Sequence, residues 1–148
     1  MQNKINIERI KQFAGEIKES LHILRGYIPK GKEQILKDST ILGSIKYNLI
    51  VAIQGCIDIC NHIVAKKGGR APQDYGDCFK LMAELGIVED NISGQLAQMA
   101  KFRNLLIHLY WQVDNDRIYE ILIKNLDDIE HFLNAIGLFL KKEMNTDL

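Results

Sequence analysis

Residues 38–66, "DSTILGSIKYNLIVAIQGCIDICNHIVAK", decide the fold. Apolar residues recur along this stretch at steps of three and four, which is typical of an α-helix. Asp38 and Ser39 are candidate caps for its first turn. Because most of its circumference is apolar, we expect a long central helix that other helices surround. The residues that define its buried positions are Ile45, Leu49, Ile53, Cys56, Ile59, Cys60 and Ile63.

Helical patterns also flank this stretch on both sides. Residues 5–27, "INIERIKQFAGEIKESLHILRGY", carry one amphipathic stripe, and the segments around Pro29 and Pro72 look like connections. After them we expect a short helix from Asp74 to Gly86, a helix from about Glu89 to Tyr110, and a last helix capped by Asp114 and running through Phe139. No stretch alternates as a strand does. The sequence therefore predicts an all-α bundle of about five helices, forming one domain over residues 1–148.

Composition excludes several classes of function. The 148 residues include nineteen basic and nineteen acidic side chains, so no global charge attracts nucleic acid or an anionic membrane. The first ten residues lack the apolar core of a signal peptide, and no apolar run approaches the roughly 20 residues that span a bilayer. We expect a cytoplasmic protein that does not bind a membrane and needs no cofactor.

Residues 103–110, "RNLLIHLY", place four polar side chains in an apolar helical pattern. With a rotation of about 100° per residue, Arg103, Asn104 and His108 share one side of the helix, and Tyr110 lies beside Arg103 if the helix extends that far. Leu105, Leu106 and Leu109 fall on the other side and are expected to face the core. The polar residues therefore form a face of their own.

The chemistry of this face suits a phosphodiester. An arginine can bind a phosphate through two hydrogen bonds, and a histidine can take up or release a proton near neutral pH. The Asn104 amide can form a hydrogen bond with the imidazole or with a phosphate oxygen. Together they suit metal-free cleavage of RNA, in which the ribose 2′-OH attacks the adjacent phosphorus, a nucleophile that DNA lacks. The reaction needs both a base and an acid, whereas one copy supplies only His108. We therefore predict a symmetric homodimer with its active cleft at the interface.

The segment "FRNLLIHLYWQVD" resembles the R-x(4–6)-H signature of the HEPN superfamily, and more closely its HepT branch, which has R-x4-H-x-Y. The resemblance extends over about residues 45–123, through "AIQGCIDICNHIV" and "VDNDRIYEIL". It implies a dimeric all-α toxin ribonuclease of a type VII-like toxin–antitoxin pair, with Arg103 and His108 catalytic. It also implies inhibition by an MntA-like nucleotidyltransferase antitoxin that transfers AMP to Tyr110, filling the space beside Arg103.

Other polar residues have two interpretations each. Asp58 and His62 lie four residues apart, so they either line the same cleft or form a buried pair that fixes helix packing. The basic side chains of Lys66, Lys67 and Arg70 belong either to a solvated loop or to an RNA path, which Lys101 could extend.

The three cysteines, Cys56, Cys60 and Cys78, favour packing over zinc binding because of their apolar neighbours, and we expect no disulfide and no metal. Two non-enzymatic functions remain open beside the nuclease. One is a helical module that binds a partner nucleotidyltransferase, and the other is a regulatory scaffold.

Overall fold

The computed structural model describes residues 4–67 and 69–146, and these residues form α-helices and 3-10 helices without a strand. The predicted all-α bundle is therefore confirmed, with seven α-helices in the described ranges where about five were expected. They are α1 (Ile7–Tyr27), η1 (Ile28–Lys30), α2 (Lys32–Lys37), α3 (Ser39–Lys67), α4 (Tyr75–Glu84), α5 (Asp90–His108), η2 (Tyr110–Gln112), α6 (Asn115–Lys124) and α7 (Leu126–Thr146).

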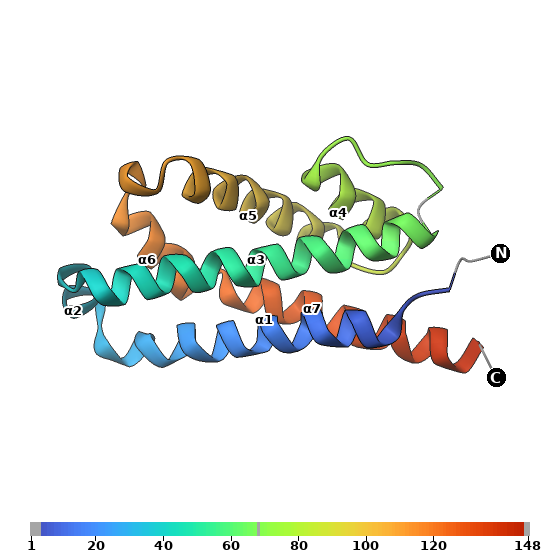
Figure 1. The fold of residues 1–148 in the computed structure, drawn as a ribbon, viewed down its shortest axis with the longest axis horizontal. Coiled ribbons are helices and arrows are strands. Elements are labelled where there is room, and N and C mark those ends of the chain that lie inside the picture. Colours follow the sequence, from blue (N-terminus) through green and yellow to red (C-terminus); the bar gives the residue numbers. More distant parts are fainter. Residues whose placement is uncertain (1–3, 68, 147–148) are drawn as a thin grey trace.

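The central helix is α3, as predicted. It lies between α1 and α5 and also contacts α2, α4, α6 and α7 (Figure 1). Asp38 caps it, because its carboxylate accepts hydrogen bonds from the backbone N–H groups of Thr40 (2.9 Å) and Ile41 (3.1 Å). All of its predicted core residues are buried in one hydrophobic cluster that draws on every α-helix.

By length and composition α3 could also cross a membrane, which corrects the expectation that no apolar run approaches that length. However, 61% of the qualifying window is buried against the other helices of the bundle. A central helix of a helical bundle meets the same criteria, because it too is apolar on most sides.

α1 runs antiparallel to α3 along most of its length (Figure 1). The two helices approach closely where Gly55 of α3 meets the fully buried Ile17 of α1. A Cβ atom at position 55 would lie 2.4 Å from Cγ1 of Ile17 and 2.9 Å from its Cδ1. Glycine at this position therefore sets the separation of the two helices.

We expect Gly55→Ala to lower the free energy of unfolding by about 1 kcal/mol. Overpacking costs about 1–3 kcal/mol, which exceeds the gain of about 1 kcal/mol from alanine's helix propensity. Gly15→Ala is the matched control, because that α1 position is exposed and has no atom within 4 Å of the added methyl group. Urea unfolding should show that the control is stabilised by about 0.5–1 kcal/mol. Stabilisation of both variants would contradict the close approach.

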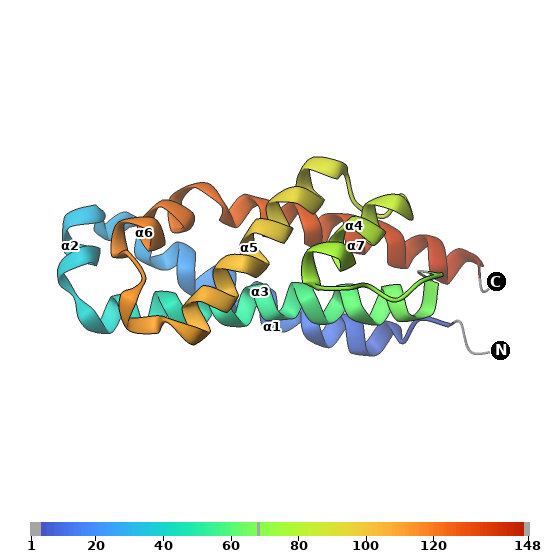
Figure 2. The same ribbon diagram turned by 90° about the horizontal axis from the view of Figure 1, so that it is seen from above.

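α5 crosses α3 obliquely, with α4 packed beside its first half (Figure 2). Asp74 caps α4 by accepting a hydrogen bond from the backbone N–H of Asp77 (2.7 Å), and Gly86, with φ of 75°, follows its end. Both positions agree with the sequence prediction. The second half of α5, which contains the start of the 103–110 segment, therefore lies over the middle of α3.

Two boundaries differ from the prediction. α5 ends at His108 rather than Tyr110, because Leu109 leaves the helical conformation (φ −128°, ψ 39°) and a 3-10 turn follows. The expected last helix divides at Asn125 into α6 and α7. Asn125 donates a side-chain hydrogen bond to Asp128 (3.1 Å), a local contact of the kind that favours asparagine at helix ends.

Candidate active site

Arg103 is held against the middle of α3 by neutral groups. Its Nη1 donates to Oδ1 of Asn104 (2.8 Å), and its Nη2 donates to Oε1 of Gln54 on α3. Its guanidinium carbon lies 5.8 Å from the ring centre of Tyr75. The buried Nε has no hydrogen-bond partner, and no carboxylate in residues 4–67 and 69–146 forms an ion pair with Arg103. The cation is therefore positioned but not neutralised.

Gln54 connects Arg103 to Asp58. The Gln54 amide donates through Nε2 to Oδ1 of Asp58 (2.8 Å) while its Oε1 accepts from Arg103. The carboxylate thus fixes which way the amide faces, and the amide presents its oxygen to the guanidinium. Sequence reasoning missed Gln54, although its position one turn before Asp58 on the same helix face was a usable signal.

His108, at the end of α5, is exposed. Within the two described ranges its imidazole forms no hydrogen bond and no ion pair. Asn104, one turn earlier, is also exposed and contacts Arg103 rather than the imidazole. Asn104 and His108 lie one turn apart on α5 and are both exposed, so the imidazole is available to a substrate or a second protein chain.

Tyr110 does not lie beside Arg103, which corrects the prediction from the helical wheel. Its hydroxyl lies 3.8 Å from the position of a Cβ on Gly43, whereas Arg103 contacts Gln54, eleven residues or about 16 Å farther along α3. The reason is the end of α5 at His108, which turns the following residues toward the start of α3.

Lys46 covers the Tyr110 ring and was not predicted. Its ammonium lies 4.5 Å from the ring centre and 3.5 Å from the Tyr110 carbonyl oxygen, and the side chain is only 8% exposed. The Trp111 ring packs edge-on against Tyr110 with centres 5.0 Å apart. A lysine in the buried register of an apolar helix was the signal that could have identified this contact.

The apolar residues of this segment are unexpectedly exposed. Only Leu106 faces the core, whereas Leu105 is 39% exposed and Leu109 43% exposed. Ile107 and Trp111 are exposed as well, and Trp111 reaches 89%. We call Leu105, Ile107, Leu109 and Trp111 the motif-side apolar residues. The expectation that Leu105 and Leu109 face the core is therefore wrong.

Asp58 and His62 do not pair with each other. Asp58 contacts Gln54, whereas Nε2 of His62 accepts a hydrogen bond from the backbone N–H of Asn6 (3.0 Å). Burial lowers the pKa of His62, and the nearby Lys66 and Arg9 lower it further. Asp58 is therefore connected to Arg103 through Gln54, while His62 connects the N-cap residue of α1 to α3.

This environment predicts a pH-dependent stability. The folded protein binds a proton at His62 less readily than the unfolded chain does, because the folded state lowers the pKa of this imidazole. The contribution of neutral His62 to the free energy of unfolding is therefore present above the unfolded pKa of about 6.5 and is lost as the pH falls below that value. His62→Gln can accept the same hydrogen bond without titrating. Urea unfolding between pH 8 and about pH 5.5 should show a steeper loss of stability for the wild type than for this variant. Parallel curves would contradict this assignment.

Two of the candidate RNA-binding cations form ion pairs within the chain. Arg70 contacts Asp77 through two hydrogen bonds of 2.7 and 2.9 Å and lowers the pKa of that carboxyl to about 2, together with a hydrogen bond from the Gln73 backbone. Lys67 pairs with Glu143 at 3.2 Å. Lys66 is half-buried near His62. These contacts favour a structural role, whereas Lys101 is exposed one turn before Asn104.

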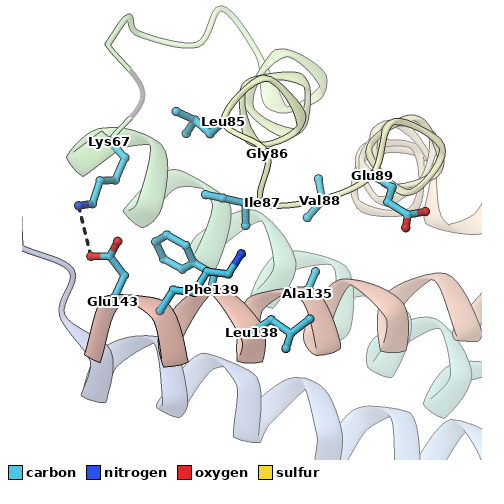
Figure 3. Close-up of a pocket in the computed structure, with 11 residues that line it drawn as sticks. Lys67, Leu85, Gly86, Ile87, Val88, Glu89, Ala135, Leu138, Phe139 and Glu143 are labelled. Carbon is cyan, nitrogen blue, oxygen red and sulfur yellow. Dashed lines mark ion pairs between the residues drawn. The ribbon is translucent and has the colours of Figure 1, made fainter. Parts of the chain in front are cut away.

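The Lys67–Glu143 pair borders an apolar groove of about 490 Å³ between the α4–α5 connection and α7 (Figure 3). Leu85, Ile87, Leu138 and Phe139 line it, and none of the residues 103–110 does. It adjoins the start of α5, about 28 Å along that helix from His108. The groove is therefore separate from the site.

The three cysteines are free and buried. Sγ of Cys60 contacts Sγ of Cys78 (2.7 Å), and Sγ of Cys78 also contacts the Asn61 amide oxygen (3.3 Å). Burial raises the pKa of the Cys56 and Cys60 thiols, which disfavours the thiolate form that binds metals. The packing interpretation of these residues is the one that their surroundings favour.

Comparisons with known proteins identify the family of this chain. The family model "Ribonuclease HepT-like" matches residues 17–136. The mRNA nuclease HepT of Shewanella oneidensis is 31% identical over 103 residues, covering 70% of this chain and 77% of the relative. A putative RNase of Archaeoglobus fulgidus is 28% identical over 102 residues, covering 64% of this chain and 76% of the relative.

A solved structure is similar over most of the chain. It is the tri-AMPylated HEPN toxin of Shewanella oneidensis in complex with its MNT antitoxin, with a TM-score of 0.80 and 28% identity. The similarity covers 87% of this chain and 96% of the toxin. On the family match, the 31% identity and the shared helical fold, this chain belongs to the HepT-like family of the HEPN superfamily.

Proposed function

We propose that this chain is the toxin of a toxin–antitoxin pair and cleaves RNA without a metal ion. The observation that carries the proposal is that the Arg103 guanidinium has no carboxylate partner among the described residues and precedes the exposed His108 on the same helix. The guanidinium donates only to neutral amide oxygens, so its charge remains available to a phosphate, and the imidazole is exposed five residues away. The names of the similar proteins, an mRNA nuclease and a HEPN toxin, support the same activity.

In the proposed reaction the ribose 2′-oxygen attacks the adjacent phosphorus while a base removes its proton. The bond from phosphorus to the 5′-oxygen breaks, and an acid protonates that oxygen. The products are a 2′,3′-cyclic phosphate and a free 5′-hydroxyl group. Arg103 stabilises the charge that grows on the non-bridging oxygens, and two copies of His108 act as base and acid.

A symmetric homodimer would supply the second histidine. Ile107 and Leu109 of the motif-side apolar residues flank His108 in the sequence, and Trp111 exposes 89% of its surface in the isolated chain. Exposed apolar residues beside polar catalytic groups are typical of a protein interface. A second copy that covers these residues would bring the two histidines and the two arginines to one cleft.

The proposed control of this activity is AMP transfer to Tyr110 by an MntA-type nucleotidyltransferase. The phenolic oxygen attacks the α-phosphorus of ATP, pyrophosphate leaves, and the phenol proton passes to solvent. The added nucleotide brings a negative charge and a bulky group two residues from His108, at the edge of the proposed interface. Since Arg103 lies farther along α3, the block acts at the cleft around His108 rather than on the Arg103 contacts of the same copy.

The test of this proposal is an RNA cleavage assay in EDTA. Single-stranded RNA should be cut to products with a 2′,3′-cyclic phosphate, and a strand of the same sequence with 2′-deoxyribose should stay intact. Loss of cleavage in EDTA, or cleavage of the deoxy strand, would contradict the mechanism.

The motif-side apolar residues also favour a second function, a non-enzymatic module that binds a nucleotidyltransferase. The partner would then cover Trp111 and its neighbours, and the chain would bind tightly without cutting RNA. Sedimentation of the chain alone distinguishes the two, because the module predicts a monomer where the nuclease requires a dimer.

A further inference from the structure

A small hollow lies beside Arg103, between the start of α4 and the middle of α5. It has a volume of about 310 Å³, and its lining residues are Asp74, Tyr75, Gly76, Ala97, Ala100, Lys101 and Asn104. This volume falls at the lower end of the range for small-molecule sites, about 300–1,000 Å³. Unlike the groove in Figure 3, it includes a residue of the 103–110 segment.

The hollow joins an aromatic wall to the candidate active site. Tyr75 is half-buried and lines the hollow, and its ring centre lies 5.8 Å from the guanidinium carbon of Arg103. Gly76, Ala97 and Ala100 also line the hollow, so little side-chain volume surrounds it next to Tyr75. A planar group that enters here would stack on Tyr75 while a phosphate attached to it reached Arg103.

The rim of the hollow provides a cation, a hydrogen-bond donor and a hydrogen-bond acceptor. Lys101 is an exposed cation, suited to a neighbouring phosphate. Oδ1 of Asn104 accepts from Arg103, which leaves the amide nitrogen to donate, and Oδ1 of Asp74 accepts from Asp77, which leaves Oδ2 to accept. A donor and an acceptor on one rim match the edge of a nucleobase, which carries both kinds of group.

We propose that this hollow is a nucleobase subsite. It takes the unpaired base of the nucleotide next to the phosphate bound by Arg103 and stacks that base on Tyr75. This inference rests on the proposed ribonuclease function, because it assigns part of the RNA substrate to the same site. It also implies that single-stranded RNA binds better than a duplex, whose bases are already stacked.

The test measures RNA binding in the His108→Ala background, where the strand stays uncut. The probes are a fluorescent single-stranded RNA of about six nucleotides and a ribose-phosphate strand of the same length without bases. Base–aromatic stacking is worth about 1–3 kcal/mol, so Tyr75→Leu should weaken binding of the complete RNA about 5- to 150-fold. Tyr75→Phe keeps the ring and should stay within about twofold of the parent.

The strand without bases separates stacking from a structural effect. Because it has nothing to stack on Tyr75, Tyr75→Leu should weaken its binding only through the lost contact with Arg103, and by much less than it weakens binding of the complete RNA. Ala97→Leu, which fills the hollow from α5 without replacing Tyr75, should weaken only the complete RNA. Circular dichroism is the control that each variant is folded.

Three results would overturn the subsite. They are equal weakening of both strands by Tyr75→Leu, no weakening of either strand, and no binding of the complete RNA by the parent protein. Failure of the nuclease proposal gives a different result from these three. If only the nuclease proposal is wrong, the wild-type protein cuts no RNA, but its RNA binding still depends on Tyr75 and on the presence of bases.

Discussion

Replacing His108 with alanine should reduce RNA cleavage by at least about 10³-fold, because a symmetric site loses both its base and its acid when each copy loses the imidazole. The exposed side chain forms no hydrogen bond or ion pair within residues 4–67 and 69–146, so the fold should not change. Cleavage of single-stranded RNA in EDTA measures the first expectation, and helical circular dichroism with thermal unfolding measures the second. His22→Ala and His131→Ala are the matched controls, since both histidines are exposed and lie outside the site.

A mixed dimer makes this prediction specific to a shared site. With different tags on the two copies, a dimer of one wild-type and one His108→Ala chain can be purified. If base and acid come from different copies, this dimer should be nearly as inactive as the double variant. A mixed dimer that retains about half of the wild-type activity would show that each copy works alone, which contradicts the composite site.

Arg103→Ala should lose cleavage to a similar extent, about 10²–10³-fold, because it removes the group that stabilises the developing charge. This variant also removes the guanidinium donor from the amide oxygens of Gln54 and Asn104. Unfolding curves are therefore needed beside the activity. Arg103→Lys keeps the charge but loses the two-pronged geometry, so its activity should also fall well below the wild type.

The helices could be predicted from the sequence because their causes are local. The continuous apolar pattern of residues 38–66 made α3 central, Asp74 and Asp114 cap the helices expected after them, and Gly86 ends α4. A cap or a positive φ depends on neighbouring residues only, so the printed sequence contains the information.

The site was predicted less completely, because its geometry depends on tertiary contacts. The helical wheel assumed that Leu105 and Leu109 face the protein's own core, whereas they are 39% and 43% exposed, and an apolar pattern alone does not distinguish a buried residue from an exposed one. The wheel also assumed that α5 reaches Tyr110, whereas the helix ends at His108. Gln54 and Lys46 become visible as site residues only when α5 lies across α3.

The phenylalanine variant of Tyr110 tests the regulatory half of the proposal. With an MntA-type partner, ATP and Mg²⁺, mass spectrometry should show AMP added to the wild type and none added to Tyr110→Phe. Only the hydroxyl group is removed, so the ring keeps the Lys46 ammonium 4.5 Å from its centre and the edge contact with Trp111. The fold and RNA cleavage should therefore be retained.

Tyr47→Phe is the matched control for this experiment. Tyr47 is 65% exposed and follows Lys46 directly on α3, so it is more accessible than the half-buried Tyr110. If the enzyme modified tyrosines by exposure alone, Tyr47 would be the acceptor and its loss would reduce labelling. We expect labelling of Tyr47→Phe to equal that of the wild type.

The decisive measurement is RNA cleavage after incubation with the partner and ATP. Wild-type protein should become inactive, whereas Tyr110→Phe should remain fully active, because no nucleotide can be attached near His108. If Tyr110→Phe is unmodified and yet inhibited, the partner blocks the cleft by binding alone. If it is both modified and inhibited, another side chain accepts AMP. Since the hydroxyl group of Tyr110 lies toward Gly43 and not toward Arg103, we expect the nucleotide to block the reaction at the His108 end of the proposed cleft. Modified wild-type protein should therefore lose cleavage while Arg103 keeps its contacts with Gln54 and Asn104.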